Sequence, residues 1–271
     1  GDVAPVAGDF VKLRTERDGC GVITAILPRK NSLVRPPVAN IDKLLIIAST
    51  APPVTEHEFI DSLTVLAEYK GITPVICVNK TDLADGSDIV RLYCSLGYRA
   101  YLVSAATGLG IDDLRRELRG AVSVLAGNSG VGKSSLLNAL YPGCTAKTGE
   151  LSEKIGRGRQ TTQRVELYPT GDNGYIADTP GYSAFDAVQM EMTDAERLPF
   201  CFPEFADYLG KCRYSDCGHL KDDGCAIRSA AESGAIALSR YKSYQSLLEE
   251  MKNAPKAYET EAGKPGKKNG R

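Results

Sequence analysis

The fold class of this chain is decided by Gly127-Asn128-Ser129-Gly130-Val131-Gly132-Lys133-Ser134. This stretch matches the phosphate-loop pattern, and it lies between an apolar run over residues 121–126, typical of a strand, and an expected helix over residues 133–140. In that setting the backbone N–H groups of the loop wrap phosphates at the positive end of the helix. We predict that Lys133 is a catalytic residue that reaches the terminal phosphates and that Ser134 binds Mg²⁺. The predicted nucleotide-binding residues here are Gly127, Asn128, Ser129, Gly130, Val131, Gly132, Lys133, Ser134 and Ser135.

Two other segments predict which base is bound. Asn79-Lys80-Thr81-Asp82 follows an expected strand over residues 73–79, and Ser104-Ala105-Ala106 follows one over residues 99–103. A buried Asp82 carboxylate would accept hydrogen bonds from both the ring N–H and the exocyclic amine of guanine, and adenine lacks this pair of donors. We expect Lys80 to cover the base and Asn79 to tie its segment to the phosphate loop. The predicted guanine site consists of Asn79, Lys80, Asp82, Ser104 and Ala105, whose N–H would meet the guanine carbonyl.

A third segment, Asp178-Thr179-Pro180-Gly181, follows an expected strand over residues 174–177. We expect Asp178 to hold the Mg²⁺ shell through water and the Gly181 N–H to sense the terminal phosphate. Thr161 and Thr162 precede another expected strand, over residues 164–168, and either hydroxyl is a candidate Mg²⁺ ligand. Thr161, Thr162 and Gly181 are therefore predicted to take part in hydrolysis.

The order of these segments along the chain is unusual. Guanine-binding loops normally follow the phosphate loop, whereas here both of them precede it. A parallel sheet still forms if the two ordinary ends of the domain are joined, and the expected joint is the stretch over residues 115–121, where a helix runs directly into the phosphate-loop strand. Because strands and helices alternate from residue 39 onward, we predict a doubly wound, mostly parallel α/β sheet. The result is a circularly permuted GTPase domain over residues 39–184.

Shorter regions flank this domain. Residues 1–38 contain two expected strands, over 9–15 and 21–27, and they are too few for a five-stranded barrel, so we interpret them as the end of a small β domain. Residues 185–271 are expected to form cysteine-bearing loops and a helix over residues 239–252. A tail from Asn253, rich in lysine, glycine and proline, is predicted to be disordered.

Three cysteines and one histidine are clustered in the C-terminal region. Cys212, Cys217, His219 and Cys225 are separated by four, one and five residues. Three thiolates and an imidazole suit a closed tetrahedral Zn²⁺ site, which would be structural because no position stays open. The alternative is a coincidental group of buried cysteines. Cys201 stands apart and is expected in the core.

Composition excludes several classes of protein. The chain has 271 residues, of which 42% are hydrophobic and 25% charged, as in an ordinary globular protein. Lysine and arginine number 33 against 34 acidic residues, so net charge gives no argument for a polyanionic partner. No apolar run approaches the ~18 residues that span a bilayer, and the first ten residues lack the pattern of a signal peptide. The cysteine pattern fits a reduced cytosol, so we predict a soluble, cytoplasmic protein that is monomeric by default.

Taken together, these motifs resemble the bacterial small-ribosomal-subunit-dependent, circularly permuted GTPases. The resemblance rests on the order NKTD, SAATG, GNSGVGKS, DTPG and CRYSDCGH with a final Cys225, and it covers residues from about 8 to 250. It implies an N-terminal oligonucleotide-binding (OB-fold) barrel, of which residues 6–9 and 27–31 look like later strands, a central GTPase domain and a C-terminal zinc domain. It also implies late maturation of the small (30S) ribosomal subunit, with hydrolysis of GTP to GDP stimulated by that subunit and its rRNA as a partner.

One position departs from the family pattern. Members commonly carry a histidine, implicated in hydrolysis, before the two threonines of the switch loop, and here Gln160 stands in that place. Glutamine orients the attacking water in other GTPases, so we predict that Gln160 is catalytic. The alternative is that Gln160 is only a polar residue of the switch loop.

Two other functions stay open at this point. One is a GTP-gated binding module with little hydrolysis, which the change at Gln160 would explain. The other is a GTPase that acts on a non-ribosomal RNA or protein, because no residue by itself specifies the ribosome. Arginines of the switch loop and lysines of the tail could contact RNA phosphates or form plain solvated surface; they are Arg157, Arg159, Arg164, Lys252, Lys256, Lys264, Lys267, Lys268 and Arg271.

Overall fold

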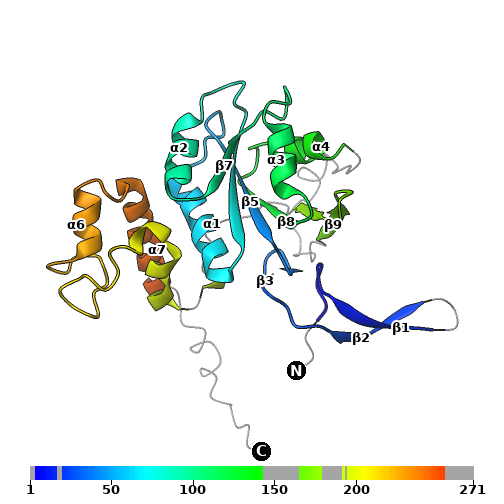
Figure 1. The fold of residues 1–271 in the computed structure, drawn as a ribbon, viewed down its shortest axis with the longest axis horizontal. Coiled ribbons are helices and arrows are strands. Elements are labelled where there is room, and N and C mark those ends of the chain that lie inside the picture. The colour runs from blue at the N-terminus through cyan, green and yellow to red at the C-terminus, as the bar shows by residue number, and fades with distance from the viewer. Residues whose placement is uncertain (1–3, 17–19, 143–164, 179–190, 193, 254–271) are drawn as a thin grey trace, which may run out of the picture.

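A computed structural model of the chain describes residues 4–16, 20–142, 165–178, 191–192 and 194–253 (Figure 1). The backbone of Asp178 is described but its side chain is not. Several predicted residues lie outside the described ranges, together with the tail from residue 254: Arg157, Arg159, Gln160, Thr161, Thr162, Arg164 and Gly181.

The centre of the molecule is a six-stranded sheet in the order β7-β6-β5-β8-β10-β9. Neighbouring strands are parallel except for β9, which pairs antiparallel with β10. All but the first residue of β5 are buried, as expected for a parallel strand covered on both faces. The strands span Lys43–Ser49 (β5), Thr73–Asn79 (β6), Arg99–Leu102 (β7), Val122–Ala126 (β8), Glu166–Pro169 (β9) and Tyr175–Asp178 (β10).

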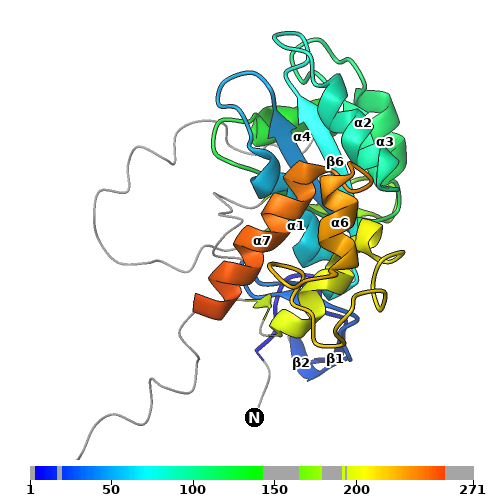
Figure 2. The same ribbon diagram turned by 90° about the vertical axis from the view of Figure 1, so that its left-hand side faces the viewer.

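Helices cover both faces of this sheet (Figures 1 and 2). Alternate residues of β5 point to opposite faces, so Leu44 and Ile46 pack with α1 (His57–Lys70) and α2 (Ser87–Ser95). Leu45 and Ile47 pack with α3 (Ile111–Leu118) and α4 (Lys133–Leu140) on the other face. The doubly wound α/β class is therefore confirmed. Helix α2 has no counterpart in the sequence-based prediction.

The joint predicted by the circular permutation is present. Helix α3 ends at Leu118 and β8 begins at Val122, so only Arg119, Gly120 and Ala121 separate the helix from the phosphate-loop strand. Gly120 has φ +68°, a left-handed conformation that a residue without a side chain adopts readily. The short connection lets β8 enter the sheet beside β5, as its order requires.

The described residues of the C-terminal region pack on the α1 side of the sheet and share its hydrophobic core. Its described elements are the 3₁₀ helices η1 (Ala195–Cys201) and η2 (Pro203–Phe205) and the helices α6 (Ala226–Glu232) and α7 (Leu238–Asn253). Helix α7 confirms the helix predicted over residues 239–252. Phe202, Phe205 and Tyr244 join the same hydrophobic cluster as Leu63 of α1. Figure 2 shows α7 lying against α1.

The described N-terminal residues form two antiparallel pairs. Strands β1 (Val11–Thr15) and β2 (Gly21–Ile26) make a hairpin that extends away from the central sheet (Figure 1), and β3 (Ser32–Leu33) pairs with β4 (Val38–Ala39). The two predicted strands are confirmed, whereas no closed barrel is formed by these residues. No described helix has the length and apolar character needed to cross a membrane.

Candidate functional site

Three loops meet at one edge of the central sheet. They follow β5, β6 and β8, which are adjacent and parallel, so their carboxyl ends lie together. Ligands bind at this edge in open α/β sheets. The predicted phosphate loop follows β8, and the predicted guanine-binding Asn79 ends β6.

Glycine is required at two positions of the phosphate loop. A Cβ added at Gly127 would lie 2.6 Å from the carbonyl oxygen of Ile47 in β5. Gly132 has φ +93°, and a Cβ there would lie 2.5 Å from Nδ2 of Asn79. The loop therefore lies directly against its two neighbours, and its backbone stays accessible to a phosphate group. Ser129 and Gly130 are exposed at its tip, and Val131 is buried beneath it.

The side chain of Lys133 is folded over the same loop. Its Nζ donates to the carbonyl oxygens of Gly127 at 2.7 Å and Asn128 at 2.8 Å. The ammonium group is thus held at the first turn of α4, where the helix dipole also favours an anion. Ser134 and Ser135 follow in that turn, Ser134 partly buried and Ser135 exposed.

Asn79 connects the phosphate loop to the other predicted guanine segment. Its Nδ2 donates to the carbonyl oxygen of Val131 at 2.9 Å, and its Oδ1 accepts from the Ala105 N–H at 3.1 Å. The side chain is 2% exposed, so both bonds are shielded from water. One buried amide therefore sets the spacing of two loops.

Asp82 and Ser104 are also brought together. The Ser104 hydroxyl donates to Asp82 Oδ1 at 2.6 Å and accepts from the Thr107 N–H at 3.1 Å. The Ser104 hydroxyl thus orients the Asp82 carboxylate, a role that the sequence did not specify. Asp82 itself is exposed, so the expected burial of its carboxylate is not provided by the chain.

The cluster in the C-terminal region has the geometry of a metal centre. Ligand atoms of Cys212, Cys217, His219 and Cys225 all lie within 4.8 Å of one another. His219 Nδ1 lies 3.5 Å from Sγ of Cys212 and 3.7 Å from Sγ of Cys225. A tetrahedral Zn²⁺ ion with its usual bond lengths holds sulfur and nitrogen about 3.5 Å apart. The donor set and its spacing therefore fit zinc.

Hydrogen bonds from outside the cluster hold its loop in place. The hydroxyls of Tyr241 and Tyr244 in α7 donate to the carbonyl oxygens of His219 at 2.8 Å and Gly218 at 3.0 Å. The Arg228 N–H approaches Cys225 Sγ at 3.3 Å. Burial lowers the pKa of His219, which favours the neutral imidazole that binds metals. Cys201 is buried elsewhere in the core, as expected.

Comparison with known proteins agrees with this arrangement. The family model described as RsgA GTPase matches residues 26–188, more than half of the chain. The chain belongs to the RsgA GTPase family. Two relatives bear the name Small ribosomal subunit biogenesis GTPase RsgA: that of Caldanaerobacter subterraneus subsp. tengcongensis is 40% identical over 94% of this chain and 86% of the relative, and that of Geobacillus thermodenitrificans is 43% identical over 94% and 88%.

Solved structures support the same assignment for this RsgA family member. YjeQ from Thermotoga maritima has a TM-score of 0.77 and 36% identity, covering 93% of this chain and 86% of its own. YloQ, described as a circularly permuted GTPase, has a TM-score of 0.75 and 32% identity, with coverage of 93% and 83%. The resemblance predicted from the motif order and the permuted fold are therefore confirmed, and the chain is a GTP hydrolase by family. Use of GTP, GDP and Mg²⁺ follows from this membership.

A buried ionic network that no sequence motif predicted is present in this RsgA family member. Arg240 of α7 is fully buried, and its Nη1 donates to Asp61 Oδ1 of α1 at 2.7 Å while its Nε donates to Glu204 Oε1 at 2.7 Å. Tyr93 and Ser243 also donate to Asp61, each at 2.6 Å. Burial opposes the charge of Arg240, but the two carboxylates hold its pKa above the ordinary value. The network joins α7 and η2 of the C-terminal region to α1.

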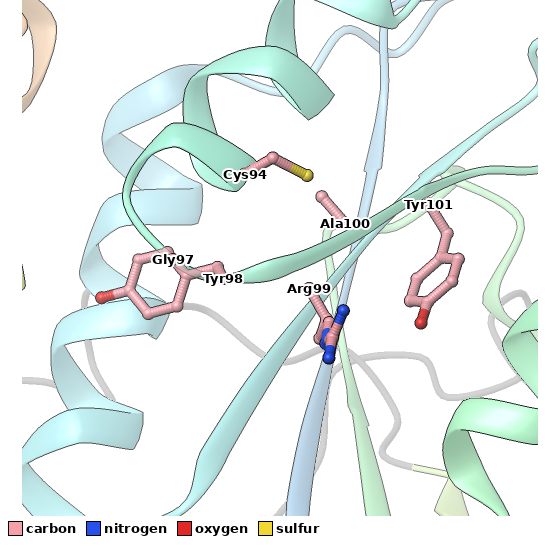
Figure 3. A pocket seen from close by; sticks show the side chains of 6 residues that line it. All are labelled: Cys94, Gly97, Tyr98, Arg99, Ala100 and Tyr101. Atoms are coloured by element: carbon pink, nitrogen blue, oxygen red, sulfur yellow. The ribbon is translucent and has the colours of Figure 1, made fainter.

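A pocket at the outer edge of the sheet is separate from these loops. Figure 3 shows its lining along the end of α2, the turn that follows and the start of β7: Cys94, Gly97, Tyr98, Arg99, Ala100 and Tyr101. No predicted nucleotide or metal ligand lines it. The candidate site of the family therefore lies at the three loops and not in this pocket.

Proposed function

We propose that this chain hydrolyses GTP during late maturation of the small ribosomal subunit, binding the subunit in the GTP state and leaving it on hydrolysis. The observation that carries the proposal is the buried Asn79 amide, which joins the phosphate loop to the guanine segment. It is supported by relatives, about 40% identical, that are named for biogenesis of that subunit.

Each described loop has a role in this proposal. Lys133 and the backbone N–H groups of residues 127–132 hold the phosphates of GTP, and the Ser134 hydroxyl binds Mg²⁺, which neutralises charge developing on the phosphates. Asp82 accepts the paired donors of guanine, the Ala105 N–H donates to its carbonyl, and Lys80 covers the base. Asp82 is exposed in the chain alone, so the bound base itself would have to bury the carboxylate.

The hydrolytic step is assigned to residues outside the described ranges. We propose that Gln160 orients the attacking water, that Thr161 or Thr162 adds a hydroxyl to Mg²⁺, and that Gly181 donates its N–H to the terminal phosphate. Asp178, at the end of β10, would hold the Mg²⁺ shell through water. The role of Gln160 rests on its place before the two threonines.

The metal centre is proposed to hold one structural Zn²⁺. Three thiolates and an imidazole complete four positions, so the ion would clamp the loop over residues 212–225 without binding substrate. We further propose three functional regions, residues 1–38 as part of an RNA-binding OB-fold, 39–184 as the GTPase domain and 185–271 as the zinc domain with a basic tail. In this proposal the chain acts as a cytoplasmic monomer and contacts the rRNA of the subunit.

GTP turnover by the full chain, with and without purified small ribosomal subunits, tests the proposal, and ATP serves as the control nucleotide. Stimulation confined to GTP is the expected result. GTP binding without stimulated turnover would favour a GTP-gated binding module, which the change at Gln160 would explain. GTP turnover that is unchanged by the subunit, in a chain that does not co-sediment with it, would indicate a different RNA or protein partner.

A further inference from the structure

The loop between β5 and α1, residues 50–56, lies between the two nucleotide-binding loops. Strand β5 is placed between β6 and β8 in the sheet. Its loop therefore emerges between Asn79-Lys80, which follow from β6, and the phosphate loop, which follows β8. No motif of the sequence marks this loop as functional.

Buried hydroxyl groups close the base of the loop. The Ser49 N–H donates to Thr55 Oγ1 at 3.0 Å, and the Thr55 N–H donates back to the Ser49 carbonyl oxygen at 2.8 Å. The Ser49 hydroxyl donates to the Ala51 carbonyl oxygen at 2.7 Å and accepts from the Ala51 N–H at 3.1 Å. Ser49, Ala51 and Thr55 are each at most 4% exposed. The backbone of the loop is thus held in one shape, with its tip, Pro52 and Pro53, outside.

The tip contacts both neighbouring loops. Lys80 Nζ donates to the Pro52 carbonyl oxygen at 2.8 Å. On the other side, a Cβ built on Gly130 would lie 3.1 Å from Cγ and 3.2 Å from Cδ of Pro53, so the proline ring faces the tip of the phosphate loop. A further hydrogen bond, from Thr50 Oγ1 to the Ala84 carbonyl oxygen at 3.4 Å, joins the loop to the segment after Lys80.

Lys80 needs such support. Its backbone has φ +64°, a left-handed conformation that is uncommon for a residue with a side chain and that persists where surrounding contacts maintain it. Its long side chain also loses rotamer freedom when it is held in one direction. The hydrogen bond to the Pro52 carbonyl oxygen orders the Lys80 side chain before a ligand binds. The loss of rotamer freedom then no longer opposes binding, which is how preorganisation raises affinity.

We propose that the Pro52–Pro53 tip is a positioning element that holds Lys80 and the tip of the phosphate loop in place for the guanine nucleotide. The inference rests on the proposed GTP-binding function. The tip acts on binding geometry and not on the groups assigned to hydrolysis. Loosening it therefore speeds nucleotide release and raises KM, while kcat at saturating GTP is retained.

The test is the dissociation rate of a fluorescent GDP analogue, mant-GDP, from the full chain and its variants. Pro53→Ala keeps the Cβ but removes the two carbons that face Gly130, and we expect dissociation to accelerate about three- to tenfold, and further in Pro53→Gly. Val54→Ala is the matched control, because Val54 is the next residue and is 56% exposed. It should stay within about twofold of the unmodified chain. Thermal melting of each variant should show that it is folded at the temperature of the assay.

A double-mutant cycle tests whether the tip acts through Lys80. In a Lys80→Met background, which keeps most of the stem but lacks the ammonium group, the effect of Pro53→Ala should shrink. Unchanged dissociation in both Pro53 variants, or an equal effect of Val54→Ala, would overturn the inference while leaving the proposed function intact. Failure of the unmodified chain to bind mant-GDP would contradict the proposed function itself, and the inference would fall with it.

Discussion

Asn79 Nδ2 lies 2.9 Å from the carbonyl oxygen of Val131, although the two residues are 52 positions apart in the chain. The oxygen of the same amide accepts from the Ala105 N–H, so three segments of the proposed nucleotide site are spaced by a single buried side chain. This bond crosses the permuted order of the chain. The guanine segments precede the phosphate loop in the sequence. In the sheet, β6 and β8 are separated by β5 alone and run parallel to it, so the loops at their carboxyl ends lie near each other.

Replacement of Asn79 by alanine should weaken GDP binding. The variant loses two buried hydrogen bonds, which together contribute about 2 kcal/mol, or about thirtyfold in Kd. Asn79→Asp keeps the acceptor for Ala105 and loses the donor to Val131. Isothermal titration calorimetry should show a lower affinity for GDP in both variants than in the unmodified chain. Equal affinity for all three proteins would contradict the role of this amide.

Asp82→Asn should change the preferred base. The new amide donates where the carboxylate accepted, which suits the carbonyl group at position 2 of xanthine and leaves the guanine amine without its acceptor. Competition between GDP and xanthosine diphosphate should therefore shift toward xanthosine diphosphate. Asp85→Asn is the control, because Asp85 is exposed three residues away and its carboxylate accepts from the N–H and the hydroxyl of Ser87. A preference for GDP retained in Asp82→Asn would exclude Asp82 as the base-reading group.

Arg240→Met should destabilise the chain strongly. It leaves the buried Asp61 and Glu204 carboxylates without their cation, a change that lowers the free energy of unfolding by about 3–5 kcal/mol. Arg116→Met, which breaks an exposed pair with Asp113, should lower it by less than about 1 kcal/mol. Urea denaturation followed by circular dichroism measures both. Similar losses in the two variants would show that burial of the network has no energetic weight.

Metal analysis of the purified chain should find one zinc ion per molecule, and Cys225→Ser should lose it. The loop over residues 212–225 has few apolar side chains, so without the ion its amides should exchange hydrogen faster while those of β5 and β6 stay protected. Cys94→Ser is the matched control, because Cys94 is exposed and outside the cluster. Full zinc content in Cys225→Ser would refute the assigned ligand set.

The Asp9–Arg29 ion pair should make N-terminal stability depend on pH. Arg29 donates to Asp9 Oδ1 at 2.6 Å and to Oδ2 at 2.8 Å, and it lowers the pKa of Asp9 from the ordinary 3.8. A lowered carboxyl pKa stabilises the fold above the ordinary value, and this contribution is lost as pH falls through the lower folded value. The difference in unfolding free energy between the chain and Asp9→Asn should therefore disappear in strong acid. A constant difference across the titration would argue against the pair.

Much of the nucleotide site could be predicted from local sequence. The phosphate loop, the guanine segments and the strands that carry them are short patterns whose chemistry needs only neighbouring residues, and the structure brings Asn79, Asp82, Ser104, Ala105 and Lys133 to one edge of the sheet. Helix α2 was missed although Ile89 and Tyr93, four positions apart, are buried on one face, because it spans only nine residues and begins after Gly86 with no side-chain cap.

The sequence by itself determined the permuted order of the loops, and it predicted the class of ligand and a set of metal-binding side chains, because the chemistry of a phosphate loop and of a cysteine–histidine cluster depends on residue types at fixed spacings. Tertiary structure alone decided which ordinary residues support them. In the sequence, Arg240 is one more charged residue of a polar helix. The packing of α7 on α1 places it beside Asp61, 179 residues away. In the sequence, Pro53 is an ordinary loop residue. Because β5 lies between β6 and β8, the loop after β5 places Pro53 next to Gly130 of the phosphate loop. Their partners are distant in the chain, and only packing brings such partners together.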